Sequence, residues 1–229
     1  MSAIASNLQA VRSRIAKAAI DAGRLPGEIA LLAVSKTWPA ACVIAANRAG
    51  QRAFGENYVQ EAIDKARATV DLDLEWHFIG PLQSNKTRLI AENFAWVHSI
   101  ERIRIAERLS AQRPDNLPPL QVCVQVNVSG EASKSGCAPE QALVLCQEIA
   151  ALPRLNLRGL MAIPEAADDF AAQRMPFRRL REIFAIARAA GLPLDTLSMG
   201  MSHDLEAAIA EGATIVRIGT AIFGERIYA

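Results

Sequence analysis

The chain has 229 residues, of which 51% are hydrophobic and 21% charged, a composition typical of a globular protein with a substantial core. The net charge of +1 provides no long-range field to attract nucleic acid or an anionic membrane, so neither is expected as a partner. The four cysteines form no CxxC pair, and neither an export signal nor a long apolar stretch is present. We therefore predict a cytoplasmic protein with reduced thiols.

The predicted elements begin with a helix over residues 2–22, where apolar residues recur at helical spacing. From residue 30 onward, short apolar runs alternate with longer amphipathic runs. The short runs predict strands at 30–35, 52–55, 75–79, 95–98, 120–127, 155–162, 194–198 and 214–218. The amphipathic runs predict helices in the gaps, at 39–49, 57–69, 84–92, 101–112, 138–151, 169–190 and 202–211.

This alternation predicts an α/β protein with a parallel sheet. Eight βα units in a chain of 229 residues favour a single (β/α)8 TIM barrel with an extra N-terminal helix. An open doubly wound sheet is the alternative, because one miscounted strand would change the prediction. No linker or change of composition divides the chain, so residues 1–229 are expected to form one domain. The polar, glycine-containing segment 128–136 predicts a mobile loop after the fifth strand.

The first predicted strand runs directly into Lys36, and Pro39 ends the segment. A desolvated lysine has a lowered pKa, and its neutral amine can attack a carbonyl to form a Schiff base. That chemistry would suit a lysine at the carboxyl end of a barrel strand. The alternative is an ordinary strand-end lysine whose stem packs while its ammonium reaches water.

Glycine-containing turns follow the last two predicted strands. The first runs from Ser198 to Ser202, where a helix is expected to begin, and the second contains Gly219 and Thr220. Phosphate sites in TIM barrels frequently lie between these two loops, because glycines expose backbone N–H groups and helix N-termini favour anions. The alternative is two turns and a helix cap without a ligand.

Two further polar residues are candidates for the same site. Arg217 alternates with apolar neighbours along the eighth strand, so it is expected to point into the barrel. A buried charge needs a partner, either a carboxylate such as Glu225 or Asp195, or an acceptor nitrogen of a ligand. Asn57 follows the second strand and could cap the next helix. The three histidines show no metal-binding spacing, so no metal site is expected.

Stretches spread over almost the whole chain resemble the YggS/PROSC family of pyridoxal phosphate homeostasis proteins. They are AVSKTWP, FGENYVQEA, WHFIGPLQSNK, VNVSGEASKSG, LRGLMAIP, LSMGMSHDLEAAI and VRIGTAIFG. The resemblance implies a barrel like the N-terminal domain of alanine racemase that binds pyridoxal 5'-phosphate (PLP). It also implies the site residues: Lys36 as the Schiff-base lysine, Ser198, Gly219 and Thr220 at the phosphate with Ser202 nearby, Arg217 at the pyridine nitrogen, and Asn57 near the ring.

The resemblance leaves two classes of function open. An arginine only donates to the pyridine nitrogen, which weakens the ring as an electron sink, although alanine racemase has the same arrangement. Racemization also needs an acid/base group opposite Lys36, which in alanine racemase is a tyrosine from a second domain of the partner subunit. The chain shows no such domain, and its tyrosines are Tyr58, a candidate replacement just past the second strand, and Tyr228.

We therefore predict a non-catalytic carrier that holds PLP on Lys36 and releases it to apo-enzymes. The alternatives are a PLP-dependent racemase-type enzyme and a barrel without any ligand. A monomer is expected, because the second domain that makes the usual dimer contacts of alanine racemase is missing.

Overall fold

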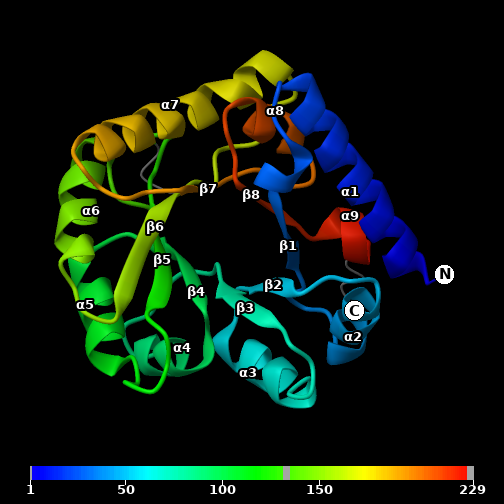
Figure 1. Cartoon of the computed structure of the whole chain (residues 1–229), viewed down its shortest axis with the longest axis horizontal. Coiled ribbons are helices and arrows are strands. Elements are labelled where there is room, and N and C mark those ends of the chain that lie inside the picture. Colours follow the sequence, from blue (N-terminus) through cyan, green and yellow to red (C-terminus); the bar gives the residue numbers. More distant parts are fainter. Residues whose placement is uncertain (1, 131–134, 226–229) are drawn as a thin grey trace.

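The fold is a closed barrel of parallel strands surrounded by helices. The computed structural model describes residues 2–130 and 135–225. The strands pair in chain order from β1 to β8, and β8 pairs with β1 (Figure 1). They are β1 (Ala30–Val34), β2 (Ala53–Glu56), β3 (Glu75–Phe78), β4 (Trp96–Ile100), β5 (Leu120–Gln125), β6 (Leu155–Met161), β7 (Thr196–Ser198) and β8 (Ile215–Ile218). The predicted (β/α)8 barrel is confirmed, and the open-sheet alternative is wrong.

Helices form the outer layer, as Figure 1 shows. They are α1 (Ala3–Asp21), α2 (Ala40–Arg48), α3 (Val59–Ala68), α4 (Thr87–Asn93), α5 (Ile103–Gln112), α6 (Ala142–Ala150), α7 (Phe170–Ala189), α8 (Leu205–Ala210) and α9 (Thr220–Phe223), with single 3-10 turns η1 (Pro26–Glu28) and η2 (Pro139–Gln141). The helix predicted at 202–211 begins only at Leu205, and α9 was not predicted.

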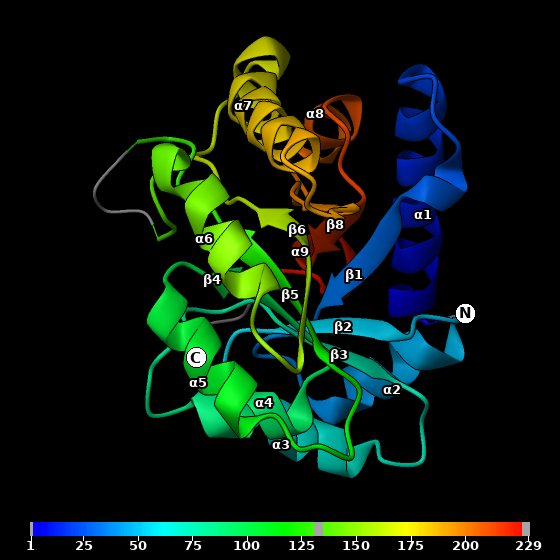
Figure 2. The ribbon, with the colours of Figure 1, turned by 60° about the vertical axis from the view of Figure 1, so that its left-hand side comes forward.

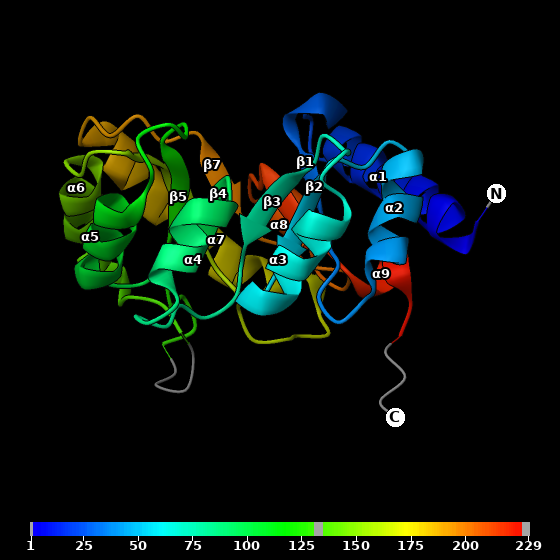
Figure 3. The same ribbon diagram turned by 90° about the horizontal axis from the view of Figure 1, so that it is seen from below.

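Helix α1 covers the seam where β8 meets β1. The Ser2 hydroxyl caps it by accepting a hydrogen bond from the Ala5 N–H at 3.3 Å. Its buried face includes Leu8, Val11 and Ile15, and it packs against α2, α8 and α9. Figure 2 shows α1 beside β1, and Figure 3 shows α1, α2 and α9 grouped at one end of the molecule. The expected N-terminal helix is therefore part of the outer helical layer of the barrel.

The barrel has an outer and an inner core. Alternate strand residues such as Ala33, Phe54 and Val216 pack under the helices in one large apolar cluster. The intervening positions face the lumen, as strand alternation requires. They form two smaller clusters, one of Leu32, Val34, Ile79 and Ile215 and one of Trp96, Cys123 and Met161. Other lumen positions are polar yet buried, among them His77, His98, Ser198 and Arg217.

The predicted loop at 128–136 includes residues 131–134, which lie outside the described residues. Its base is closed by a bridge between Val126 and Cys137, and the Gly136 N–H donates to the Glu101 carboxylate at 3.2 Å. Of the helices in residues 2–130 and 135–225, none combines the length and apolar character needed to cross a bilayer.

Candidate cofactor site

A pocket of about 210 Å³ opens at the carboxyl ends of the strands. Every residue predicted for the cofactor site lines it except Ser198: Lys36, Asn57, Ser202, Arg217, Gly219 and Thr220. Its remaining lining residues are Val34, Trp38, Ile79, Ile163, Met201, His203 and Gly224. The structure therefore unites residues from the ends of β1, β2, β7 and β8 on the face where barrel enzymes hold their active sites.

Lys36 lies just beyond the end of β1 and is half-buried in the pocket wall. The next residue, Thr37, has a φ of 68°, which is rare for a β-branched side chain. The main chain is tied on both sides, because the Ser35 N–H donates to the Gly55 carbonyl at 3.1 Å and the Thr37 N–H donates to the Glu61 carboxylate. Such strain persists only where the surroundings enforce it, so the turn that presents Lys36 is firmly held.

A buried ionic cluster behind β1 and β2 provides this hold. Lys65 of α3 is 5% exposed, and its ammonium donates to Glu56 Oε1 at 2.7 Å, Glu61 Oε1 at 2.6 Å and the Ser35 carbonyl at 2.7 Å. These contacts use all three ammonium protons. Burial raises the pKa of Glu56, while Lys65 and the Ser35 hydroxyl oppose the rise. This cluster was not predicted, although a glutamate at a strand end and a Glu61–Lys65 pair at i,i+4 spacing are visible in the sequence.

Asn57 directly follows β2 and faces the pocket. Its Oδ1 atom is buried and has no hydrogen-bond partner among the described residues. The predicted capping role is wrong, because Tyr58 occupies the N-cap of α3 and no side chain caps that helix. Gly80 sets the position of Asn57, since a Cβ on Gly80 would lie 2.3 Å from the Asn57 carbonyl oxygen. The pocket therefore contains a buried acceptor whose hydrogen-bonding capacity is unused among the described residues.

The loops after β7 and β8 meet at the pocket. Ser202 Oγ accepts a hydrogen bond from the Ala221 N–H at 3.5 Å, which joins the two loops. Gly219 precedes α9, so Thr220 and Ala221 begin a helix whose first N–H groups have no acceptor within it. A Cβ on Gly219 would lie 3.1 Å from the Val34 carbonyl oxygen, which explains a glycine there. The Thr220 N–H and the hydroxyls of Ser202 and Thr220 form a donor-rich wall suited to an anion.

Arg217 is 3% exposed and reaches the pocket from the lumen. Its Nη1 donates to Ser198 Oγ and its Nη2 to the Ala162 carbonyl, both at 2.8 Å. Burial lowers its pKa to about 10, so it remains a cation at neutral pH.

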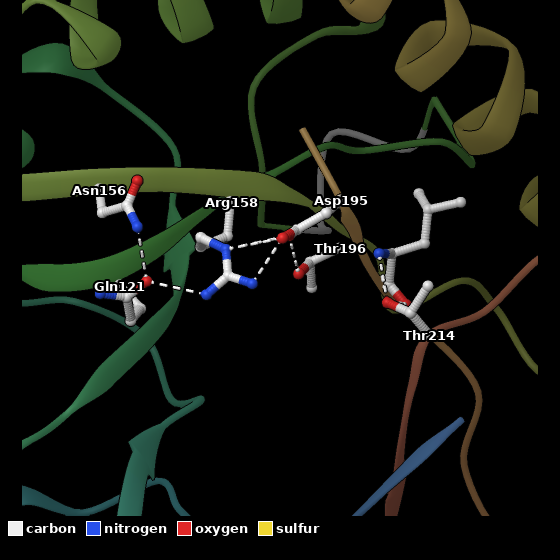
Figure 4. Close-up of polar contacts among 7 residues, drawn as sticks. Gln121, Asn156, Arg158, Asp195, Thr196 and Thr214 are labelled. Atoms are coloured by element: carbon white, nitrogen blue, oxygen red, sulfur yellow. Dashed lines mark hydrogen bonds and ion pairs between the residues drawn. The ribbon is translucent and has the colours of Figure 1, made fainter. Parts of the chain in front are cut away.

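The expected carboxylate partners of Arg217 are wrong. Asp195 instead holds Arg158, with Arg158 Nη2 2.6 Å from Asp195 Oδ2 (Figure 4). Glu225 is exposed, and no ion pair joins it to Arg217 in the described chain. Two of the five guanidinium donors are used by the contacts to Ser198 and Ala162, so others remain for a ligand.

Ser198 is the predicted residue that the structure does not bring to the pocket. Its side chain is fully buried, accepts from Arg217 and lies 2.7 Å from His98 Nδ1. As the last residue of β7 it lies on the lumen face with Arg217, and the phosphate role that the family resemblance implies for it stays a prediction. The sequence analysis also missed His98 and His77, which lie at inward positions of neighbouring strands.

The lining of the pocket is rich in hydrogen-bond donors and carries two basic side chains, a composition that suits an anionic ligand. Its polar groups are an amine, a guanidinium, hydroxyls, backbone N–H groups, the imidazole of His203 and the side-chain amide of Asn57. Among residues 2–130 and 135–225, no group of three or more His, Cys, Asp or Glu side chains is arranged to hold a metal ion. Fold and site together define a class: a TIM barrel with a lysine after β1 and a donor-rich wall after β7 and β8.

Comparison with known proteins narrows this class. The model of the family "Alanine racemase, N-terminal domain" matches residues 1–227. The pyridoxal phosphate homeostasis protein of Pseudomonas aeruginosa is 63% identical over all of this chain and 98% of its own length. That of Escherichia coli K12 is 55% identical over all of this chain and 99% of its own length.

Solved structures give the same result. PipY of Synechococcus elongatus, determined with PLP bound, is 39% identical with a TM-score of 0.84 and covers 96% of this chain and 100% of its own. Alanine racemase of Corynebacterium glutamicum, 19% identical with a TM-score of 0.71, covers 96% of this chain and 60% of its own, and shares the fold. The chain belongs to the YggS/PROSC family of pyridoxal phosphate homeostasis proteins.

Proposed function

We propose that this protein binds PLP in the pocket at the carboxyl ends of its strands and acts as a carrier in PLP homeostasis. The observation that carries the proposal is the buried, unpartnered Asn57 Oδ1 in a pocket that also presents Lys36 and Arg217. A protein seldom leaves a buried acceptor without a partner unless a ligand supplies one. The relative PipY, 39% identical, has been solved with PLP bound.

Each pocket residue has a role suited to one part of the cofactor. When bound, PLP would supply an aldehyde, a group that condenses reversibly with a lysine amine with loss of one water. Lys36 is the amine, and Thr37 and the Lys65 cluster hold it in place. Ser202, Gly219 and Thr220 donate to the phosphate, and Arg217 donates to the ring nitrogen. Asn57 Oδ1 accepts from a polar group at the ring edge.

Absorbance spectroscopy with added PLP tests the anchor. The wild type should develop an imine band that sodium borohydride fixes as a stable amine on Lys36, identified by peptide mapping. Lys36→Ala should lose the band and retain the circular dichroism of the fold. Lys86→Ala, at an exposed lysine outside the pocket, is the matched control and should keep the band. Labelling of another lysine in the wild type would refute the assignment.

The carrier role is favoured over a racemase by the position of Tyr58. Its side chain is 58% exposed and does not line the pocket, so it is poorly placed as an acid/base partner opposite Lys36. His203 lines the pocket and could exchange a proton, which keeps racemization testable. Incubation with a panel of amino acids in deuterated water should give no α-deuterium. Incorporation that His203→Ala abolished would support the enzyme instead.

Release to apo-enzymes is the second half of the proposal. Loaded protein should activate an apo PLP-dependent enzyme, and borohydride-reduced protein should not, because the reduced link cannot be hydrolysed. Equal activation by the reduced protein would show that free PLP in the sample was responsible. We also propose that the protein acts as a monomer, which sedimentation analysis with and without PLP would test.

A further inference from the structure

A continuous column of polar side chains crosses the barrel lumen from the pocket to its opposite end. Arg217 Nη1 lies 2.8 Å from Ser198 Oγ, which lies 2.7 Å from His98 Nδ1. His98 Nε2 lies 2.9 Å from His77 Nδ1, and His77 Nε2 lies 2.7 Å from Glu75 Oε1. Glu75 begins β3, so its half-exposed carboxylate lies at the amino ends of the strands. The proposed function above uses only the first member of this column.

The two ends of the column fix the direction of every hydrogen bond. Arg217 only donates, so Ser198 Oγ accepts from it and gives its own proton to His98 Nδ1. His98 then carries its proton on Nε2 and donates to His77 Nδ1. His77 likewise carries its proton on Nε2 and donates to the Glu75 carboxylate, which only accepts. For neutral imidazoles, both histidines are therefore the Nε2–H tautomer.

The reversed arrangement fails at both ends. With protons on the two Nδ1 atoms, His77 Nε2 would face the Glu75 carboxylate at 2.7 Å as two acceptors without a proton between them. Ser198 would accept from both Arg217 and His98, and its own hydroxyl proton would have no acceptor in the contacts that the described residues make. Each fault leaves a buried polar group unpaired, which is costly in a lumen away from water.

Burial also disfavours a charged histidine in the column. His77 is 3% exposed and His98 is fully buried. Desolvation lowers the pKa of His77 despite the opposing effect of Glu75, and it holds the pKa of His98 well below its usual range, helped by His77 and Arg217. The hydrogen bond from His77 lowers the pKa of Glu75, which therefore stays an acceptor.

A second set of side chains closes the far end of the column. Trp96 stacks on His77 with 5.3 Å between ring centroids and 4° between planes. Arg158 lies over Trp96, 5.0 Å from its centroid, and is held there by Asp195 and Gln121 (Figure 4). Stacked rings under a fixed guanidinium keep the His77 ring from turning, so the order of the column is supported by packing as well as by hydrogen bonds.

We propose that Ser198, His98, His77 and Glu75 are positioning residues that lock Arg217 in one orientation and one proton arrangement, so that a bound cofactor's ring nitrogen receives a hydrogen bond but no proton. The inference rests on the proposed function, because it assigns the ring nitrogen to Arg217. The protons of the column already have acceptors pointing away from the pocket, so none can move toward the ring without breaking the order. A ring nitrogen kept unprotonated is a weak electron sink, which suits storage rather than catalysis.

The tautomers are tested first, in the protein without PLP. Long-range proton–nitrogen correlation spectra of nitrogen-15-labelled protein distinguish the two neutral histidine forms from the cation. His77 and His98 should both show the Nε2–H pattern at neutral pH, with His203 as internal reference outside the column. An Nδ1–H or cationic pattern at either residue would overturn the proposal. Glu75→Leu, at the half-exposed end, should produce a tautomer mixture, whereas Glu92→Leu at the same end of the barrel should not.

The effect on the cofactor is tested with Ser198→Ala and two ligands, PLP and its deaza analogue with CH in place of the ring nitrogen. Ser198→Ala should weaken PLP binding about tenfold and leave the analogue unaffected, because only PLP has the acceptor that Arg217 serves. Ser110→Ala, which removes another buried serine hydrogen bond far from the site, should affect neither ligand. Equal loss for both ligands would show a merely structural role and refute the proposal.

The two proposals fail separately. Ordered tautomers in a protein that binds no PLP would refute the proposed function and leave the column standing as a structural device. PLP binding by Lys36 with mixed tautomers, or with equal effects on both ligands, would refute the column and leave the proposed function. Glu75→Leu with the two ligands replaces Ser198→Ala if that variant does not fold, and the same difference between ligands is expected.

Discussion

Replacing Lys65 by methionine should destabilise the fold far more than the same substitution at a surface lysine. The substitution keeps the length of the apolar stem and removes an ammonium that makes three hydrogen bonds of 2.6–2.7 Å. Glu56, with a side chain that is 0% exposed, would keep only the Ser35 hydroxyl as a donor. Removing one partner of a buried ion pair costs about 3–5 kcal/mol, because the other charge is left without compensation.

The loss should depend on pH with a definite sign. Burial already raises the pKa of Glu56 above its ordinary 4.5 in the folded protein, and Lys65 limits that rise. Without Lys65 the folded pKa rises further, so the folded variant binds a proton that the unfolded chain releases. Such a group favours folding below its unfolded pKa and loses that contribution as pH rises through the folded pKa. The difference in unfolding free energy between wild type and variant should therefore become smaller as pH falls from 7 toward 4.5.

Urea unfolding followed by circular dichroism at several pH values measures both effects. Lys17→Met is the matched control, because Lys17 pairs with Asp21 on the exposed face of α1 and should lose less than about 0.5 kcal/mol. Adding Glu56→Gln to Lys65→Met should restore part of the stability by removing the stranded charge. A loss of unfolding free energy in Lys65→Met no larger than in Lys17→Met would refute the buried ion pair. So would a difference between wild type and variant that grows as the pH falls.

Three other outcomes are expected. Gly80→Ala should lower stability by about 1–3 kcal/mol and weaken PLP binding, because its Cβ would meet main-chain atoms of Asn57, the residue after β2. Gly27→Ala, which has open space around it, should have neither effect. A thermal melt and a PLP titration measure the two effects. Of the four cysteines, Cys42 alone should react quickly with a thiol reagent in the native protein, because burial raises the pKa of the other three; rapid release of two or more equivalents would contradict this. Glu211→Gln should lower the free energy of unfolding in urea by roughly 2–3 kcal/mol, because three arginines of α7 surround a carboxylate that is 0% exposed. Glu206→Gln, at a carboxylate whose side chain is 44% exposed, should lower it little.

The barrel could be predicted because periodicity is a local property of the sequence. Each strand was visible as a short apolar run, and the period of the intervening helices required a parallel sheet. Helix starts were less certain, as α8 shows: Ser202 resembles a cap, yet Asp204 takes the N-cap position and its carboxylate accepts from the Met201 N–H. Capping depends on which polar side chain turns back toward the main chain, and spacing alone does not decide that.

More of the pocket could be predicted from the sequence than of the residues that hold the pocket in place. Lys36 and Arg217 were recognisable because each is a charged residue within or next to a buried strand, and the resemblance to a family gave them roles. Their supports were not recognisable. Lys65 looked like any lysine of an amphipathic helix, and the two lumen histidines are 21 residues apart in the chain. Both supports depend on contacts between elements, which exist only once the barrel is closed.

Those supports hold Lys36 and Arg217 in fixed positions at the two sides of the pocket. The Lys65 cluster lies outside the strand layer and holds the main chain on either side of Lys36, while the lumen column holds Arg217 from within. The two share no residue, so the positions of Lys36 and Arg217 are fixed independently. Neither network presents a side chain that removes a proton from the ligand, because the column's donors point toward Glu75 and the ammonium of Lys65 is fully used. Binding geometry is thereby preorganised while acid/base chemistry is absent from both supports, which is the combination a reversible carrier needs.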